Sequence, residues 1–128
     1  MIVVAALIKA EGKLLVCQRR RTDSFGLMWE FPGGKLEHGE TPSEALAREL
    51  QEELGVVAQI GPEIFRTRHR YFELGEALDL IFFGATVDPA AVRNLAFEKM
   101  EWREPQTLHE LNFLPADREF VTKLAKQT

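Results

Sequence analysis

The chain has 128 residues, of which 45% are hydrophobic and 28% are charged, and this balance is typical of a soluble globular domain with a real core. Its formal charge of −4 argues against a general nucleic-acid-binding protein, although a small anionic ligand would respond only to local charge. The single cysteine, Cys17, excludes an internal disulfide and a thiolate metal cluster, and it suits a reducing compartment.

The first segment, MIVVAALIKAEGK, lacks the basic region and the cleavage site of a signal peptide. No apolar run in the chain reaches the roughly 20 residues that a membrane span needs. We therefore expect one domain over residues 1–128, located in the cytoplasm and not associated with a membrane. IVVAALI and LLVCQ are short apolar runs rich in β-forming residues, and the turn-like KAEGK between them predicts a hairpin of two buried strands.

The polar segment RRRTDSFGLM is expected to be a loop, and a glycine-rich stretch then leads to a strong helix start. Thr41 can cap the helix, Pro42 suits its first position, and Glu44 completes a capping box. We expect the helix to run to about Leu54, with Gly55 as its stop.

The second half of the chain predicts more strands and a final helix. VVAQIGPEIFRTRHRYF and ALDLIFFGATV are predicted strands joined through the turn-like ELGE, and KMEW is a further short strand. Pro115 is expected to open the last helix, PADREFVTKLAK. Strands and helices in this mixed order on one core predict an α/β (α+β) sandwich with a mixed sheet.

Three glutamates, Glu49, Glu52 and Glu53, share one side of the first predicted helix near its C-terminal end. Each like-charge pair at this spacing costs about 0.2–0.5 kcal/mol, and the helix dipole disfavours anions in the last turn by roughly 0.3–1 kcal/mol each. The only cation inside the helix is Arg48. Carboxylates that converge without lysine partners suit a hard divalent cation such as Mg²⁺, and the alternative is a solvated acidic face.

The glycine-rich segment GGKLEHGE precedes this helix directly. Gly33 and Gly34 let the backbone approach a ligand or metal closely, and Lys35 could meet a phosphate. A flexible connector would also be rich in glycine, so this segment alone leaves both interpretations open.

Together, the segment and the helix resemble the Nudix box, which has a Gly, five residues, a Glu, seven residues, and then Arg-Glu-hydrophobic-any-Glu-Glu-any-Gly-hydrophobic. This sequence matches every specified position, and the matching residues are Gly34, Glu40, Arg48, Glu49, Leu50, Glu52, Glu53, Gly55 and Val56. WEFPGGKLEHGET further resembles the MutT-like branch of the family, and the order of strands and helices is similar across nearly the whole chain.

The resemblance implies an α/β/α sandwich and an enzyme that hydrolyses a nucleoside diphosphate linked to another moiety. MutT-like members cleave a nucleoside triphosphate, such as an oxidised or modified one like 8-oxo-dGTP, to the monophosphate and pyrophosphate. Mg²⁺ or Mn²⁺ is the implied cofactor. The implied partner is a small nucleotide rather than a nucleic-acid polymer or a membrane, and we expect a monomer or a homodimer.

The resemblance also assigns roles by position. Glu49, Glu52 and Glu53 would bind metal, and one of them would also orient or deprotonate the attacking water. The Gly33 carbonyl would be a further metal ligand, and Arg48 would position Glu49 by an ion pair. The structural positions of the box are Gly34, Glu40 and Gly55.

Two more positions follow from the same resemblance. MutT-like enzymes often carry a late metal-binding glutamate six residues before a strand tryptophan, but counting back from Trp102 gives Ala96. Glu98, two positions later, is our candidate, and the alternative is an ordinary surface carboxylate. Arg19 matches an arginine that contacts the substrate phosphates, alongside the phosphate-binding candidate Lys35.

On the base side, Phe31 either packs in the core or touches the nucleobase. The LPAD segment resembles the region where MutT-like enzymes read the base edge with Asn or Asp, and here the residue is Asp117. A protonated carboxyl can donate one hydrogen bond and accept another, as an oxidised purine or a cytosine requires. The alternative is an acid that is favoured simply because it lies in the first turn of a helix.

The three arginines of RTRHR alternate along a predicted strand, so they share one face and either flank a polyphosphate or cover an exposed sheet. We predict that Phe72, Leu78 and Phe82 belong to the core.

Two other functions stay open. A hydrolase of the same fold could cleave ADP-ribose or a dinucleoside polyphosphate, although the short chain lacks the added N-terminal region of many ADP-ribose members. A non-catalytic Nudix-like module could bind a damaged base or a protein, although such modules typically lose box carboxylates and this box keeps all of them.

Overall fold

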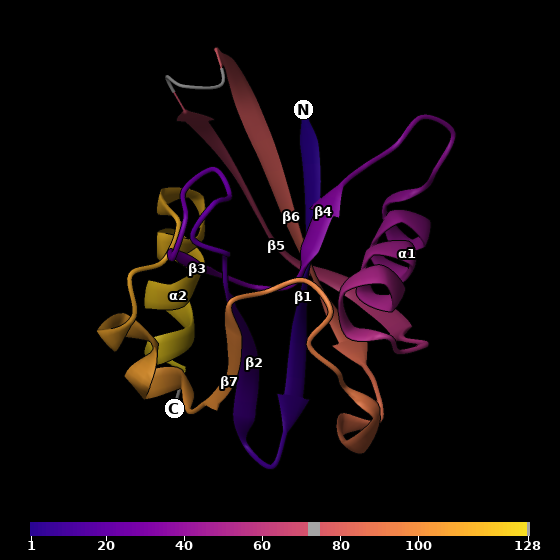
Figure 1. Ribbon diagram of the computed structural model, residues 1–128. Coiled ribbons are helices and arrows are strands. Elements are labelled where there is room, and N and C mark those ends of the chain that lie inside the picture. Colours follow the sequence, from indigo (N-terminus) through magenta and orange to yellow (C-terminus); the bar gives the residue numbers. More distant parts are fainter. Residues whose placement is uncertain (72–74, 128) are drawn as a thin grey trace.

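The computed structural model describes residues 1–71 and 75–127 (Figure 1). The strands are β1 (Ile2–Ala10), β2 (Lys13–Gln18), β3 (Trp29–Glu30), β4 (Gly33–Lys35), β5 (Gln59–Tyr71), β6 (Glu76–Thr86) and β7 (Lys99–Arg103), and the helices are α1 (Pro42–Leu54) and α2 (Arg118–Ala125). Short 3-10 turns cover Pro89–Ala91, Pro105–Glu110 and Pro115–Asp117. Within the described ranges, no helix combines the length and the apolar character needed to cross a membrane.

The seven strands of the described residues form one mixed sheet around β1. β1 pairs in parallel with β6, and β5 pairs with the far side of β6 in the antiparallel direction. Near its start β1 also pairs with β4, and at its end it forms the predicted hairpin with β2. β7 and β3 then pair with β2. The two ends of β1 therefore join the two parts of the sheet.

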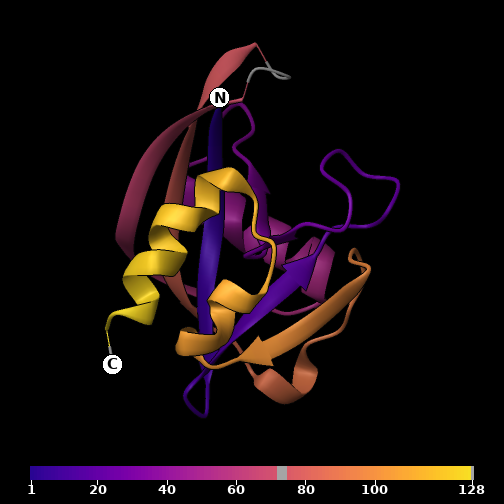
Figure 2. The same cartoon turned by 90° about the vertical axis from the view of Figure 1, so that its left-hand side faces the viewer.

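Alternate side chains of β1 enter two separate cores. Val4, Ala6 and Ile8 pack in the cluster that includes the apolar face of α1, whereas Ala5 and Leu7 pack in the cluster beneath α2. Figure 1 shows the two helices on opposite sides of β1, and Figure 2 shows α2 lying over one face of the sheet. The predicted α/β/α sandwich with a mixed sheet is confirmed.

The ends of α1 follow its local sequence. The Thr41 side chain accepts a hydrogen bond from the Glu44 N–H at 3.2 Å, and the Glu44 carboxylate accepts one from the Thr41 N–H at 2.8 Å. Gly55 ends the helix with a left-handed φ of 67°. The capping box and the stop are therefore those predicted.

The glycine-rich segment is the first correction, because Gly33 to Lys35 form β4 rather than a loop. Gly33 has a φ of 157°, and a Cβ built on it would lie 2.0 Å from the Val4 carbonyl oxygen. The absence of a side chain at Gly33 thus lets this short strand pair tightly with β1. A flexible connector is excluded for these three residues.

The C-terminal helix is the second correction, because it begins at Arg118 and not at Pro115. Pro115 to Asp117 instead form a 3-10 turn, in which the Asp117 N–H donates to the Leu114 carbonyl at 2.9 Å. Three apolar side chains of the helix, Phe120, Val121 and Leu124, are buried against the sheet side of the core.

Two core predictions are confirmed. Leu78 and Phe82 lie in the core beneath α2, as predicted, and Cys17 is completely buried in the other core cluster. Phe72 and the first part of the predicted ELGE turn lie outside the described residues.

The left-handed conformation of Gly55 predicts that a larger residue at this position destabilises the fold. A Cβ at this position would lie 2.9 Å from Arg93 Nη2, and any side chain must adopt the left-handed conformation. We expect Gly55→Ala to lower the free energy of unfolding, measured by urea denaturation, by about 1–2 kcal/mol. Gly12→Ala is the matched control, since Gly12 has a φ of 78° and no atom within 4 Å of the added Cβ. An unchanged free energy in Gly55→Ala would contradict the prediction, and equal losses in both variants would assign the effect to the backbone alone.

Candidate active site

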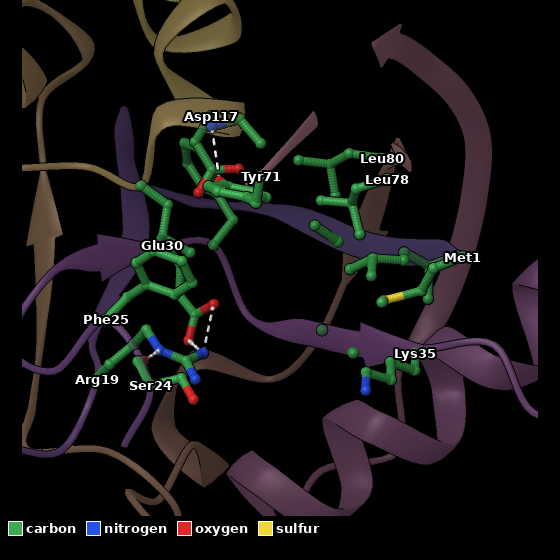
Figure 3. A pocket seen from close by; sticks show the side chains of 18 of the residues that line it. Met1, Arg19, Ser24, Phe25, Glu30, Lys35, Tyr71, Leu78, Leu80 and Asp117 are labelled. Atoms are coloured by element: carbon green, nitrogen blue, oxygen red, sulfur yellow. Dashed lines mark hydrogen bonds and ion pairs between the residues drawn. The ribbon is translucent and has the colours of Figure 1, made fainter. Parts of the chain in front are cut away.

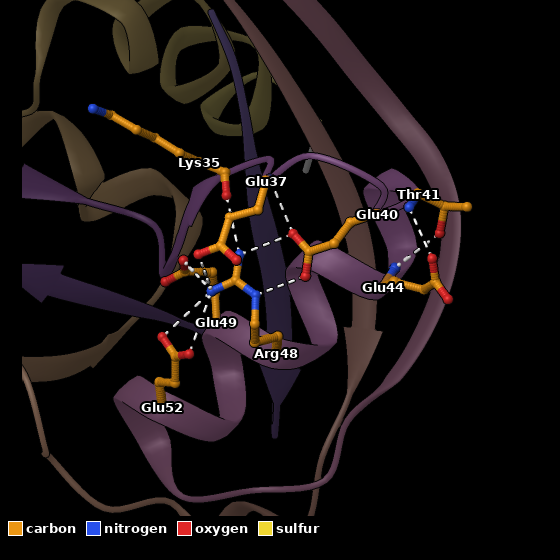
Figure 4. A network of polar contacts seen from close by, with 8 residues as sticks. All are labelled: Lys35, Glu37, Glu40, Thr41, Glu44, Arg48, Glu49 and Glu52. Carbon is orange, nitrogen blue, oxygen red and sulfur yellow. Dashed lines mark hydrogen bonds and ion pairs between the residues drawn. The ribbon is translucent and has the colours of Figure 1, made fainter.

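Arg48 connects α1 to the segment that precedes it (Figure 4). Its Nε donates to Glu40 Oε2 at 2.7 Å, and its Nη2 donates to the Lys35 carbonyl at 3.1 Å. Its Nη1 donates to Glu49 Oε1 at 2.9 Å and to the Glu52 carboxylate at 3.4 Å. Hydrogen bonds from this guanidinium hold the pKa of Glu40 below its ordinary value. One side chain therefore fixes both the loop and two of the three predicted metal ligands.

Gly34 packs directly on the Glu49 carboxylate. A Cβ added to Gly34 would lie 2.4 Å from Glu49 Cδ, so any side chain there would displace the carboxylate. The glycine that the Nudix box specifies at this position thus lets β4 approach α1 closely and leaves room for the Glu49 side chain.

Glu53 points from the last turn of α1 into the interior. Its Oε1 accepts a hydrogen bond from the Gly33 N–H at 3.0 Å. Burial, followed by the charges of Glu30 and Glu49, raises the pKa of Glu53 to about 9. This carboxylate is therefore ionised at neutral pH only if positive charge comes close to it.

The donor set of this region suits a hard divalent cation, because Glu49, Glu52, Glu53 and the Gly33 carbonyl offer only oxygen atoms. A cation at Glu53 would also offset the burial and the neighbouring acidic charges that raise its pKa. Over residues 1–71 and 75–127, no three acidic, histidine or cysteine side chains already converge as a ligand set. In this arrangement Arg48 draws Glu49 and Glu52 toward its own guanidinium. Metal binding by these residues stays a prediction.

A cavity of about 300 Å³ extends from Glu53 to the C-terminal 3-10 turn (Figure 3). Apolar side chains of β1 and β6 line much of it. Its polar and charged lining residues are Arg19, Ser24, Glu30, Lys35, Glu53, Tyr71 and Asp117. The structure thus brings seven predicted site residues to one cavity, which are Arg19, Phe31, Gly33, Gly34, Lys35, Glu53 and Asp117.

Asp117 is buried at the end of the cavity away from Lys35, with only 4% of its surface exposed (Figure 3). Burial raises the pKa of this carboxyl well above its ordinary range, and the charge of Glu30 adds to the increase. Asp117 is the N-cap residue of α2, but its side chain makes no capping hydrogen bond. Helix capping therefore does not explain an acid at this position.

Arg19 also reaches the cavity, but its guanidinium already has partners. Nη1 lies 3.1 Å from Glu30 Oε2, and Nε donates to the Ser24 carbonyl at 2.7 Å. Burial raises the pKa of Glu30, and Arg19 opposes the increase. Phosphate binding by Arg19 stays a prediction, and it would require this ion pair to rearrange.

Glu30 and Tyr71 were missed by the sequence reasoning. Glu30 had a usable signal, because it is a lone charge between two aromatic residues, Trp29 and Phe31, that are both buried. Tyr71 had no such signal in the sequence, since its place in the cavity depends on how the end of β5 packs against the C-terminal segment.

Both interpretations of Phe31 hold in part, because Phe31 packs against the rings of Phe82 and Phe113 and also lines the cavity.

Glu98 is not among the described residues that line this cavity. It is exposed, and its Oε1 accepts a hydrogen bond from the Arg21 N–H, at 3.4 Å, in the loop after β2.

The three arginines of β5 are also exposed. Two of them form ion pairs on the surface of the sheet, Arg66 with Glu63 and Arg68 with Asp79, each at 2.7 Å. These contacts support the exposed-sheet interpretation for the arginines.

Comparison with known proteins assigns the family, since residues 1–124 match the NUDIX domain. The chain belongs to the Nudix family. This Nudix chain is 34% identical over 116 residues to a CTP pyrophosphohydrolase of Escherichia coli K12, covering 90% of this chain and 84% of that protein. It is also 34% identical over 130 residues to an 8-oxo-dGTP diphosphatase of Haemophilus influenzae, covering 98% and 92%.

Among solved structures, the crystal structure of the MutT protein from Methanosarcina mazei Go1 superimposes with a TM-score of 0.86 at 24% identity, covering 98% of this chain and 93% of that one. This likeness shows the shared fold. The family match and the two relatives confirm the predicted membership of the MutT-like Nudix hydrolases, enzymes that act on phosphoanhydride bonds.

Asp117 makes the stability of this Nudix domain depend on pH. Because its pKa is raised from 3.8 in the folded state, the folded chain holds the proton to higher pH than the unfolded chain. The free energy of unfolding therefore falls as the pH rises from 3.8 toward the raised pKa. We expect Asp117→Asn to show a shallower fall in urea denaturation between about pH 4 and pH 9, and to exceed the wild type in stability at the alkaline end.

The control for this experiment is Glu104→Gln, which neutralises an exposed carboxylate. We expect this control to follow the wild-type curve. A wild-type slope retained in Asp117→Asn would contradict the assignment.

Proposed function

We propose that this Nudix hydrolase cleaves nucleoside triphosphates, including oxidised or modified ones, to the monophosphate and pyrophosphate with Mg²⁺ or Mn²⁺ as cofactor. One observation carries the proposal: a single cavity joins Glu53 of the Nudix box to the buried acid Asp117. Its volume of about 300 Å³ is at the lower limit for small-ligand sites and suits a nucleoside. The activities named for the two relatives, on CTP and on 8-oxo-dGTP, support the same substrate class.

At the phosphate end, Glu49, Glu52, Glu53 and the Gly33 carbonyl would hold the cation. Bound Mg²⁺ would neutralise the diphosphate charge and polarise the reacting phosphoryl group. One of the three carboxylates orients or deprotonates the attacking water. Arg48 keeps Glu49 in place through their 2.9 Å ion pair.

The remaining substrate contacts divide along the cavity. Lys35 is exposed at the rim near Gly34 and would attract the phosphates, together with Arg19 once it exchanges Glu30 for a phosphate oxygen. At the other end, the raised pKa of Asp117 favours the protonated carboxyl. This group donates one hydrogen bond and accepts another, which matches the adjacent acceptor and donor on the edges of guanine and cytosine.

A nucleotide panel tests the proposal. We expect pyrophosphate release from at least one of 8-oxo-dGTP, dGTP, CTP and a modified cytosine triphosphate, and we expect chelation of Mg²⁺ to abolish it. ADP-ribose and a dinucleoside polyphosphate complete the panel. Turnover confined to these two compounds would overturn the triphosphate assignment. Metal-free binding with no release from any compound would instead indicate a binding module.

Glu53→Gln tests the role of the box helix. The amide keeps the shape of the buried side chain, and its oxygen can still accept the hydrogen bond from the Gly33 N–H, so the thermal midpoint should not fall. We expect kcat to drop by about 100-fold or more, because the variant loses one of the carboxylates that would hold the cation against the diphosphate. Glu104→Gln serves as the control and should retain wild-type kcat. Full activity in Glu53→Gln would remove the proposed mechanism.

A further inference from the structure

The 3-10 turn that carries Asp117 has no capping side chain of its own. Leu114 precedes the turn, and its apolar side chain cannot accept a hydrogen bond. Pro115 has no N–H, so the first backbone donor of the turn is the N–H of Ala116. Ala116 is only 4% exposed, and a buried donor without a partner is costly. This turn therefore needs an acceptor from elsewhere in the fold.

Tyr71 supplies that acceptor. Its hydroxyl oxygen accepts the hydrogen bond from the Ala116 N–H at 2.9 Å, across 45 residues of sequence. Tyr71 is the last residue of β5, is 7% exposed, and is the only tyrosine of the chain. A strand on the edge of the sheet thus caps a turn next to the C-terminal helix.

The Tyr71 ring is itself held in place. Its centroid lies 5.1 Å from that of Phe25 and 4.5 Å from that of His69. Figure 3 shows Tyr71 and Asp117 together at one end of the cavity that both residues line. The hydroxyl therefore has a fixed position beside the turn.

We propose that Tyr71 is a positioning residue for nucleobase selectivity, because its hydroxyl fixes the Ala116 backbone and thereby the direction of the Asp117 carboxyl. The inference rests on the proposed function, in which Asp117 reads the base edge. The Asp117 side chain makes no capping bond. Because the rotamers of a side chain are defined relative to its backbone, a rotation of the turn redirects the carboxyl. Without the hydroxyl, the Ala116 N–H must turn toward another acceptor, and Asp117 moves with it.

A purely structural role for Tyr71 predicts a different result. General loosening of the C-terminal segment would weaken the binding of every nucleotide alike. Loss of a positioning contact changes the ratio of affinities between bases, because hydrogen-bond reading depends on direction. The ratio is thus the measurement that separates the two roles.

The experiment compares Tyr71→Phe, which keeps the ring, with Thr67→Val as a matched control. Thr67 lies on the same face of β5 and its hydroxyl donates to Glu119 of α2 at 3.0 Å, but it is not among the residues that line the cavity. Isothermal titration without metal measures Kd for the monophosphates 8-oxo-dGMP, dGMP, CMP and AMP. Steady-state kinetics with the matching triphosphates measure kcat and KM separately.

We expect Tyr71→Phe to reduce the affinity ratio between the best and the worst base by about 3- to 10-fold. We also expect it to raise KM for the best substrate by a similar factor with little change in kcat. Thr67→Val should keep the wild-type ratio. An unchanged ratio in Tyr71→Phe, or equal changes in both variants, would overturn the inference.

A rescue variant tests the capping explanation directly. Leu114→Ser places a hydroxyl at the cap position of the turn, where serine is a favoured acceptor. We expect Leu114→Ser in the Tyr71→Phe background to recover the affinity ratio of Leu114→Ser alone, and no recovery would overturn the capping role. The proposed function fails separately, if the wild type hydrolyses no triphosphate, because monophosphate binding still reports on Tyr71.

Discussion

The burial of the Glu53 carboxylate is the constraint on which the rest of the site depends. This group accepts a hydrogen bond from the Gly33 N–H, and burial, followed by the charges of its acidic neighbours, raises its pKa to about 9. For that bond to form, β4 must lie close to the last turns of α1. The missing side chains at Gly33 and Gly34 make the approach possible, since a Cβ on either residue would collide within 2.4 Å of a neighbouring atom. The glycines of the Nudix box thus allow its glutamates to pack against β4. The repulsion between like charges on α1 is the energetic cost of placing carboxylates at the cavity.

Glu30 connects the electrostatics of the two ends of the cavity. Its charge raises the pKa of Glu53 on one side and that of Asp117 on the other, after the larger effect of burial in each case. Arg19 offsets part of this charge through its 3.1 Å ion pair. In the proposed function the two ends offset the negative charge of Glu30 in different ways, because Asp117 holds a proton whereas Glu53 binds a metal cation. A neutral acid can then donate to a base edge while an ionised one faces the phosphates.

The sequence predicted the features that local chemistry determines. The capping box at Thr41 and Glu44, the stop at Gly55 and the hairpin of β1 and β2 all depend on residues close together in the chain, and all are confirmed. The features it missed depend on distant partners. β4 forms because Gly33 and Gly34 pair with Ala5 and Val4, nearly 30 positions away. The late start of α2 accompanies an Ala116 N–H that bonds to the hydroxyl at the end of β5. No window of neighbouring residues contains that information.

The difference between local and distant contacts also affects how substitutions could change nucleobase selectivity. The phosphate end is built from one continuous segment, β4 and α1, whose internal contacts through Arg48 hold it together. The base end is assembled from β3, the end of β5 and the C-terminal turn, which meet only in the folded chain. Substitutions at the base end can therefore change the cavity without disturbing the carboxylates of α1. Two relatives that are each 34% identical to this chain bear names that specify CTP in one case and 8-oxo-dGTP in the other, and this is the pattern that such independence of the two ends would produce.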